Sequence, residues 1–386
     1  MNDITIDKTG WKKYRFDEMV QNISERVEPS QTDLDVYVGL EHIDPDSLHI
    51  KRHGHPSDVE GTKLRFYKGD IIFGRRRAYQ RKTALATTYG ICSAHAMVLR
   101  AKEDVIDPLF LPFLFHSKSF IDMAITISVG GLSPTINWKD IAKQEFLLPP
   151  KPEQKRLAAL LWAADEMVEK EKREREMVEE YKNLLITSTI LNGPKSIVLN
   201  ELGSVIRGVS YKPEQVITRH ESDAIILLRS NNISPNFQTN YTEVYYIDNS
   251  ILKSEQELRL GDIIICMSNG SKELVGKASE ITETPTVKTS VGSFCAIYRP
   301  HSDSHFVKYL FQSSEYRKQI ALLLSGSNIN NLKPSDIESV VFNIKEKIDK
   351  TAMDSLRKTD GIISRLFIQI EQSQKIKQEL INKIFV

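Results

Sequence analysis

The stretch LLPPKPEQKRLAALLWAADEMV, residues 147–168, marks a change from short alternating segments to a long charged segment with helical periodicity. Pro152 followed by Glu153 favours a helix start, because proline has no N–H to leave unpaired and the carboxylate faces the positive end of the helix dipole. The tripeptide Asn192-Gly193-Pro194 ends the pattern, since asparagine tolerates a left-handed conformation and proline does not continue a helix. The spacing predicts a helix of about 38 residues, about 57 Å long. Its apolar face carries Leu157, Leu160, Leu161, Ala164, Met167 and Val168.

A second long helix is predicted over residues 350–385. Neither helix can bury its narrow apolar face alone, so we expect the two to pack on each other, antiparallel, as a coiled coil. Two independent solvated helices are the alternative. The charged run EKEKRERE, residues 169–176, is interpreted as a solvated face stabilised by neighbouring opposite charges. The second helix shows a heptad seam with a polar middle, formed by Leu366, Ile370, Ser373, Lys377, Leu380 and Ile384.

The sequence contains two similar copies of one unit, each a globular part followed by a long helix, with a nearly constant offset. The aspartates of KGDIIF and LGDIII are separated by 262 − 70 = 192 residues, and the later segments by 195 or 196. Five similar segments in the same order indicate a duplicated unit rather than chance. The pairs are residues 68–73 with 260–265, 113–120 with 309–316, 130–141 with 326–337, 162–168 with 357–363, and 181–185 with 376–380.

Each copy is predicted to be a mixed α+β domain. Short apolar or alternating runs bounded by Gly, Asn, Ser and Pro are typical of strands, and one short helix is expected near residues 109–127 and another near 305–324. The predicted domains are a first target domain at 1–150, a long helix at 151–192, a second target domain at 193–345 and a long helix at 346–386. The predicted strands are Val36–Leu40, Asp70–Phe73, Ala94–Arg100, Ile225–Leu228, Asp262–Cys266 and Phe294–Tyr298.

Charge, hydropathy and cysteine content limit the class of protein to one with a local basic face and without a membrane helix. The charge balance is 52 basic against 51 acidic residues, yet residues 63–82 hold eight basic residues and one acidic residue, a local charge of 8 − 1 = +7. No apolar run of about 18 residues occurs, so no membrane helix is expected, nor a secretory signal at the start. Three cysteines without a C-x-x-C pair favour a reducing cytoplasm.

Motifs for chemistry are absent from the sequence. Gly203 and Gly208 have the spacing of a phosphate loop, but Val209 stands where its lysine would be. The histidines at 49, 53 and 55 lie in a polar loop without partners at zinc-site spacing, so no metal site is expected. The buried-strand positions of Cys266 and Cys295 indicate small hydrophobic residues. Two similar domains joined by long helices therefore favour a positioning device over an enzyme.

Polar loops after matching strands are the candidate DNA contacts. Arginine pairs bidentately with guanine and asparagine with adenine, and any basic side chain can hold phosphate. The loop at 74–82 in the first copy is basic, whereas its counterpart at 267–277 is rich in amides and hydroxyls. A solvated basic turn is the plainer alternative for the first loop, and an ordinary connecting turn for the loops at 132–137 and 328–333. The candidates are Arg75, Arg76, Arg77, Tyr79, Arg81, Lys82, Ser133, Asn137, Ser268, Asn269, Ser271, Lys272, Asn328, Asn330, Asn331 and Lys333.

The stretch 147–168 resembles the junction in specificity subunits of type I restriction–modification systems, where a strand ends in Pro-Pro and a Glu-Gln pair opens the first conserved helix. The KGDIIF and GGLSPTIN segments resemble the target-recognition domains of that family, and YKNLL at 181–185 resembles the end of its conserved helix. The second copy departs from the pattern, because FNIKEKIDK at 342–350 lacks both Pro-Pro and Glu-Gln. The second junction is therefore expected to differ from the first.

The resemblance implies a non-catalytic subunit that binds a bipartite, asymmetric site on double-stranded DNA, one half for each target domain, with the helix pair fixing the spacer. It also implies two methyltransferase subunits that bring S-adenosylmethionine and methylate adenine at N6. In complete systems two ATP- and Mg²⁺-dependent restriction subunits join them. No cofactor is expected in this chain.

Two other functions stay open from the residues alone. A helical scaffold or adaptor would use the helices to bind protein and would not bind DNA. A reader for an orphan or type II-like methyltransferase would bind DNA without a restriction subunit. A fragmentary nuclease fits less well, because no recognisable motif of metal-binding carboxylates occurs in the sequence.

Overall fold

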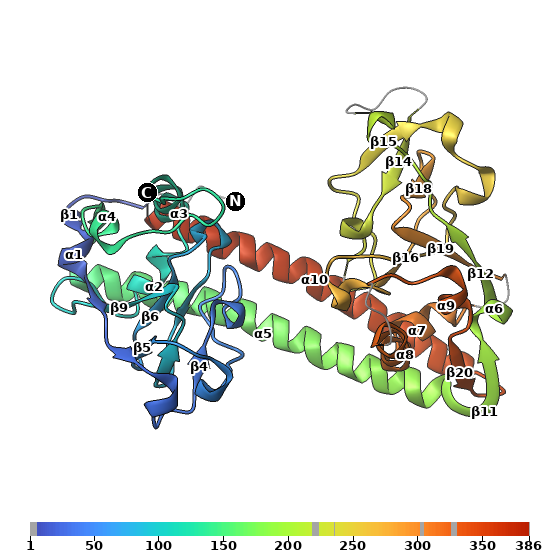
Figure 1. Ribbon diagram of the computed structural model, residues 1–386, viewed down its shortest axis with the longest axis horizontal. Coiled ribbons are helices and arrows are strands. Elements are labelled where there is room, and N and C mark those ends of the chain that lie inside the picture. The colour runs from blue at the N-terminus through green and yellow to red at the C-terminus, as the bar shows by residue number, and fades with distance from the viewer. Residues whose placement is uncertain (1–5, 218–223, 235, 302–304, 326–329, 386) are drawn as a thin grey trace. The chain divides into compact units, whose positions relative to one another are not determined.

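A computed structural model of the chain describes residues 6–217, 224–234, 236–301, 305–325 and 330–385. The chain forms two compact units, each described here by itself. The first unit comprises residues 1–174 and 366–386, and the second comprises residues 175–365. Each unit therefore holds one copy of the globular repeat and a part of each long helix (Figure 1).

The first unit contains two four-stranded sheets and a two-stranded pair (Figure 1). One sheet is antiparallel, in the order β2-β9-β6-β7, with β2 at Val20–Ile23, β9 at Ala96–Ala101, β6 at Ile71–Gly74 and β7 at Thr83–Leu85. The other has the order β3-β5-β8-β4, with β3 at Arg26–Val27, β5 at Lys63–Phe66, β8 at Gly90–Cys92 and β4 at Tyr37–Val38. The pair joins β1, Lys12–Arg15, to β10, Glu145–Leu148, and the short helices are α1 (Phe16–Met19), α2 (Leu111–Leu114), α3 (Lys118–Thr126) and α4 (Trp138–Ile141).

The second unit repeats the first sheet and the strand pair. Its sheet β12-β19-β16-β17 contains β12 (Gly203–Arg207), β19 (Cys295–Pro300), β16 (Ile263–Cys266) and β17 (Ala278–Glu280). The pair is β11 (Leu191–Val198) with β20 (Val341–Ile344). The other sheet has the order β13-β15-β14-β18, with β13 at Val216–Ile217, β15 at Tyr245–Asp248, β14 at Ala224–Leu228 and β18 at Thr289–Val291. The helices are α6 (Leu199–Leu202), α7 (Val307–Gln312), α8 (Ser314–Ser325) and α9 (Pro334–Glu338).

The second sheets differ between the two units. In the first, the parallel pair β4–β8 has β4 at the edge, and β5 separates β8 from β3. In the second, the parallel pair β14–β18 has β18 at the edge, and β15 separates β14 from β13. The duplication is therefore retained in one sheet and in the strand pair, while the other sheet has diverged.

The Gly-Asp motif of the repeat is a structural turn. Gly69 and Gly261 both have positive φ, at 92° and 86°, which favours glycine. Each following aspartate is buried and accepts two hydrogen bonds from an arginine of the neighbouring strand. For Asp70 these come from Arg100 at 2.7 and 2.9 Å, and for Asp262 from Arg299 at 2.9 and 2.7 Å. The motif thus closes the turn and ties two strands of the conserved sheet.

The single short helix expected in each copy is two helices, so that prediction was wrong. In the first unit α2 ends at Leu114 and Ser117 caps α3, because its Oγ accepts from the Phe120 N–H and donates to the Leu114 carbonyl. In the second unit Ser313 makes the same two bonds, to the Leu310 carbonyl and from the Tyr316 N–H. A serine hydroxyl that competes for backbone groups breaks the helix at both positions.

The long helices are α5, Lys151–Thr189, and α10, Lys350–Ile384. They pair antiparallel in each unit, as predicted. In the first unit Lys377 contacts Asp165, whereas Gln369, earlier in α10, contacts Glu171, later in α5. In the second unit Lys182 pairs with Asp360. The predicted seam of α10 is buried at Leu366, Ile370, Ser373 and Ile384, and partly buried at Lys377 and Leu380.

Each unit has its own core, and the helices contribute to both. In the first unit Leu157 and Leu161 of α5, Ile384 of α10 and Phe385, which follows α10, join the domain core. In the second unit Ile186 of α5 joins the corresponding core. The three cysteines are buried and free, and for Cys266 and Cys295 this was predicted from their strand positions. Burial raises the pKa of the Cys92 and Cys295 thiols. The predicted α+β fold with a paired helical element is confirmed.

Candidate nucleic-acid interface

Two loops of the first unit that are distant in sequence form one surface. The basic loop follows β6, and the polar loop at 130–137 precedes α4. The Arg77 N–H donates to the Pro134 carbonyl at 2.7 Å, and the Ile136 N–H donates to the Arg75 carbonyl at 3.0 Å. These backbone bonds place predicted residues from both loops beside each other.

The side chains of this first loop pair converge on Ser133. The guanidinium groups of Arg76 and Arg77 each donate to its Oγ, at 3.1 Å. Arg76 also lies 3.3 Å from the Nε2 atom of His95. Burial, together with the charges of Arg76 and Arg75, lowers the pKa of His95 and favours its neutral form. The result is a concentrated positive surface with spare N–H donors, since each guanidinium has five.

Arg77 also has unusual backbone geometry. It adopts a left-handed conformation with φ 56°, and Arg81 does the same with φ 55°, on either side of a short 3-10 turn at Ala78–Gln80. Such conformations are uncommon for residues with a side chain and concentrate at functional sites. The turn leaves Tyr79 half exposed.

Other predicted residues of the first unit bond within the unit. Arg81 pairs with Asp46 and donates to the His116 carbonyl at 3.1 Å, and Lys82 donates to the Leu40 carbonyl at 2.6 Å. Asn137 donates to the Asp140 carboxylate at 3.3 Å, near the start of α4. The charged groups of Arg81 and Lys82 thus stabilise the loop, and their predicted contact with DNA stays a prediction.

The second unit brings the matching loops together in the same way. The Leu332 N–H donates to the Met267 carbonyl at 2.8 Å, and the Asn269 N–H donates to the Asn330 carbonyl at 3.3 Å. Ser268 and Asn331 form an isolated bridge, as Arg76 and Thr135 do in the first unit. The two copies therefore build an equivalent loop pair from different residues.

The second loop pair carries amide and hydroxyl groups where the first carries arginines. Asn269 donates to the Ser230 hydroxyl at 3.4 Å, and Asn330 donates to the Gly270 carbonyl at 3.2 Å. Ser271 bonds to Glu273 at 2.6 Å. The predicted residues Asn331, Lys272 and Lys333 are exposed, and Asn328 lies outside the described residues.

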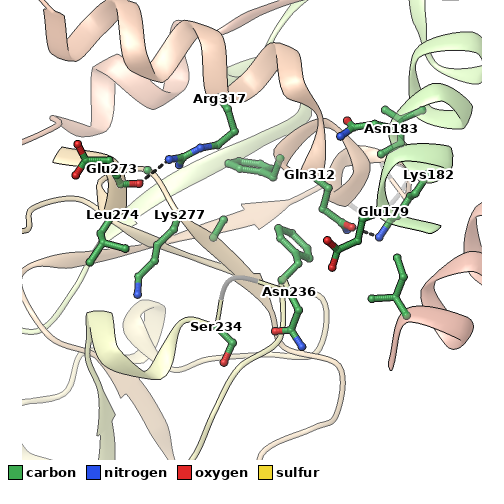
Figure 2. A pocket seen from close by; sticks show the side chains of 16 residues that line it. Glu179, Lys182, Asn183, Ser234, Asn236, Glu273, Leu274, Lys277, Gln312 and Arg317 are labelled. Carbon is green, nitrogen blue, oxygen red and sulfur yellow. Dashed lines mark hydrogen bonds between the residues drawn. The ribbon is translucent and has the colours of Figure 1, made fainter. Parts of the chain in front are cut away.

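The second loop is also anchored to α8, beside a cleft of about 400 Å³ lined by residues of α5, α7 and α8 and by this loop (Figure 2). Arg317 donates to the carbonyls of Glu273 and Val275, at 2.7 and 3.2 Å. The end of the loop is therefore held to the body of the domain, while its polar residues at 268–272 lie beyond the anchor.

Sequence reasoning missed His95 and Ser230. His95 precedes β9, and the pairing of Gly74 with Ala96 puts it beside Arg76. Ser230 follows β14 and meets Asn269 from the second loop. Both contacts depend on strand register, and single residues after strands carry no signal for it in the sequence.

Two further observations concern the described part of the chain. No helix there combines the length and the apolarity needed to cross a bilayer. Among the described residues, no group of three His, Cys, Asp or Glu side chains is placed to hold a metal ion. The His49 side chain bonds to Asp165 at 2.6 Å.

Fold and loops together define a duplicated two-domain protein whose helices pair antiparallel and whose domains present equivalent polar loop pairs. Residues 10–180 match the family described as type I restriction modification DNA specificity domain. The EcoKI specificity subunit of Escherichia coli K12 is 34% identical over 178 residues, which cover 45% of this chain and 38% of that protein. The StySPI specificity subunit of Salmonella potsdam is 33% identical over 159 residues, covering 40% and 34%. Residues 10–180 are thus similar to the DNA specificity domain of type I restriction–modification systems.

These two matches span less than two fifths of the length of each relative. The MjaVIII specificity subunit of Methanocaldococcus jannaschii is matched more fully, at 23% identity over 320 residues, or 76% of this chain and 73% of that protein. Among solved structures, the type I restriction–modification S subunit from M. genitalium aligns over 99% of this chain and 98% of its own, with 15% identity and a TM-score of 0.48. The HsdS subunit of Thermoanaerobacter tengcongensis aligns over 100% and 98%, with 18% identity and a TM-score of 0.40.

Proposed function

We propose that the chain is a DNA sequence-specificity subunit that binds a bipartite, asymmetric target, one half with each domain, and catalyses no reaction itself. The observation that carries the proposal is the loop pair, which recurs at equivalent positions in both units with different side-chain chemistry. Equivalent placement suits two readers of one polymer, and different chemistry suits two unlike half-sites.

The first loop pair suits phosphate and guanine. A guanidinium fork can donate two parallel hydrogen bonds to guanine O6 and N7, and any arginine can hold a phosphate oxygen. Ser133 holds Arg76 and Arg77 in fixed positions, which lowers the entropy lost when they bind. The second loop pair, with Asn269 and Asn331, offers amides, which suit adenine N6 and N7.

Partner subunits would supply the chemistry. We expect two methyltransferase subunits that carry S-adenosylmethionine and methylate adenine at N6. In systems that also cleave DNA, two restriction subunits with ATP and Mg²⁺ would join. A role on the chromosome would place the assembly in the cytoplasm of a bacterial or archaeal cell.

Exposed apolar residues on the helices support a duplicated partner. Met167 and Ile362 are 46% and 39% exposed, and they are separated by 362 − 167 = 195 residues, the offset of the repeat. Tyr181 and Ile376 are 56% and 41% exposed and have the same separation. Large apolar side chains left in water at repeated positions are typical of protein contact sites. We expect two copies of one partner protein to bind there, each covering one set of these residues.

DNA retention tests this function. The purified chain, alone and with its methyltransferase partner, is applied to a pool of double-stranded fragments at low salt, and the retained fragments are sequenced. We expect enrichment of one interrupted motif, stronger when the partner is present. No retention in either case, with the partner still bound, would favour the adaptor function instead.

A further inference from the structure

Two ion pairs join α5 to α10, one within each unit. In the first unit the Lys377 Nζ atom lies 3.0 Å from Asp165 Oδ1, and the two side chains are 12% and 2% exposed. In the second unit Lys182 pairs with Asp360, and these side chains are 12% and 27% exposed. Charges so far removed from water are stable only when paired.

The two pairs are copies of each other. Asp360 follows Asp165 by 360 − 165 = 195 residues, and Lys377 follows Lys182 by 377 − 182 = 195. Each helix therefore carries one aspartate and one lysine, seventeen positions apart (182 − 165 and 377 − 360). In an antiparallel pair, the aspartate of each helix then meets the lysine of the other.

Each aspartate is also bonded to the globular domain of its own unit. His49 lies 2.6 Å from Asp165 Oδ2. Burial alone would raise the pKa of Asp165, but the bonds from His49 and Lys377 hold it at about 2, so the carboxylate stays charged. In the second unit the Tyr309 hydroxyl donates to Asp360 at 3.0 Å, and Lys308 lies 3.6 Å away.

Besides the two ion pairs, Gln369 and Ser373 of α10 donate to Glu171 of α5 at 2.8 and 3.1 Å. The apolar seam by itself leaves the axial register of the helices undetermined. Its residues recur every three or four positions, so a slip of one heptad, about 10 Å, would again set apolar residues against apolar residues. The same slip would separate both aspartates from both lysines and leave four poorly solvated charges unpaired. A single polar position in a helix pair is known to fix its register for this reason.

We propose that the two repeat-related ion pairs, Asp165–Lys377 and Lys182–Asp360, fix the axial register of the α5–α10 pair. The consequence for function rests on the proposed role in DNA reading. A fixed register sets how far apart the two half-sites are read, so these four residues determine the spacer length of the target without contacting DNA.

Spin-label distance measurements on the full chain without DNA test the register. Labels are attached at Lys155→Cys in α5 and Gln372→Cys in α10, both exposed and both in the first unit. The native cysteines are buried and free, so they are poor targets for the label. The two sites are far apart along the helix axis, so that a slip of one heptad changes their separation by about 10 Å.

The pair-free variant replaces Asp165, Lys377, Lys182 and Asp360 with leucine. We expect one distance in the unmodified chain and a second, shifted by about 10 Å, in this variant. The control removes an exposed ion pair within α10, Asp354→Leu with Arg357→Leu, and keeps the single distance. If the pair-free variant keeps helicity and shows only the original distance, the proposal is overturned.

A second comparison decides the matter if the pair-free variant does not fold. Asp165→Lys alone places two lysines together and is expected to shift or broaden the distance distribution. Asp165→Lys with Lys377→Asp restores opposite charges and is expected to restore the original distance. Equal disturbance in both variants would contradict the proposal. A shifted register with an unchanged methylation spacer would leave the register assignment standing and count against the proposed function.

Discussion

Ser133 shows how a neutral residue can organise a charged surface. Its single hydroxyl oxygen accepts from both Arg76 and Arg77, which would otherwise repel each other and move freely in water. The two guanidiniums keep their remaining N–H groups for a ligand, because one bond uses only a fraction of the five donors. The backbone of Arg77 is also held in place, because its N–H donates to the Pro134 carbonyl at 2.7 Å.

The first prediction concerns these arginines. Replacing Arg75, Arg76 and Arg77 with alanine should weaken DNA binding by at least about tenfold at low salt, because three cationic contacts are lost. The measurement is fluorescence anisotropy with labelled target DNA across a salt series, where the slope of log affinity against log salt should also decrease. Lys12→Ala with Lys13→Ala is the control, since both residues are exposed and lie on β1, outside both loops. Equal affinity and slope for the triple variant and the unmodified chain would remove the arginines from the interface.

The second prediction concerns His116, which is buried beside the Thr83 carbonyl. Burial, with the charge of Lys377, lowers its pKa from 6.5 to about 4. Between these values the unfolded chain binds a proton that the folded chain does not, so the free energy of unfolding falls as pH drops from 6.5 to 4. The loss is at most about 3 kcal/mol.

Tryptophan fluorescence measures this loss in the first unit, because all three tryptophans, at 11, 138 and 162, belong to it. In His116→Gln the drop between pH 6.5 and 4 should shrink, since glutamine does not titrate. Gln312 occupies the matching position of the repeat in the second unit, which shows that the fold accommodates glutamine there. An identical pH dependence in the variant would show that another group is responsible.

At the scale of elements, Gln154 joins the strand pair of the first domain to α5. Its side chain is buried and bonds to three backbone groups. The amide nitrogen donates to the Val105 and Pro149 carbonyls at 3.1 and 2.9 Å, and the amide oxygen accepts from the Asp107 N–H at 2.7 Å. The second junction has Asp349 instead, which accepts from the Thr351 N–H at 3.2 Å at the start of α10. The departure seen in the sequence of the second copy is thus a different junction.

The third prediction follows from this contact. Gln154→Ala leaves two carbonyls and one N–H buried without partners and should lower the free energy of unfolding of the first unit by about 2–4 kcal/mol. Urea unfolding followed by tryptophan fluorescence measures the change. The control is Lys155→Ala, because Lys155 is the next residue of the same helix and is exposed. It should change the free energy of unfolding by less than about 0.5 kcal/mol. A comparable effect in both variants would mean that Gln154 contributes only helix propensity.

Much of the element plan was predictable because it rests on local signals. Apolar periodicity gave the two long helices, and short bounded apolar runs gave the strands β6, β9, β16 and β19. The break at Ser117 was missed, because serine within an apolar helical pattern does not reveal that its hydroxyl will bond to the backbone. The different order of the second sheets was also beyond prediction, since pairing partners are chosen by tertiary packing.

The candidate site was predictable only in part, for the same physical reason. Loop composition identified Arg76 and Ser133 separately, but their meeting spans 57 residues and depends on how two strands and a helix pack. Arg81 and Lys82 carry the same charge signal as their neighbours, yet they bond within the domain. Composition shows which side chains a loop has and not which way they point.

At the scale of the whole molecule, the proposed function requires that the helix pair sets the spacing of the two half-sites. The fourth prediction deletes seven residues, 170–176, from α5 alone. The deletion removes two turns of the helix and about 10 Å of its length, while α10 is unchanged. Either the spacer of the recognised motif should change or methylation should stop, because Asp165 and Lys182 can no longer meet their partners together. Full activity on the original motif would show that the length of α5 does not set the spacer.

The most direct test of the central claim is a map of methylated adenines in the genome of a host that expresses the methyltransferase partner. We predict methylation at one interrupted, asymmetric motif when this chain is present and none at that motif when its gene is deleted. In the triple arginine variant, methylation of the motif should fall. An adenine methylation pattern that is the same with and without the chain would contradict its role as the reader of the DNA sequence.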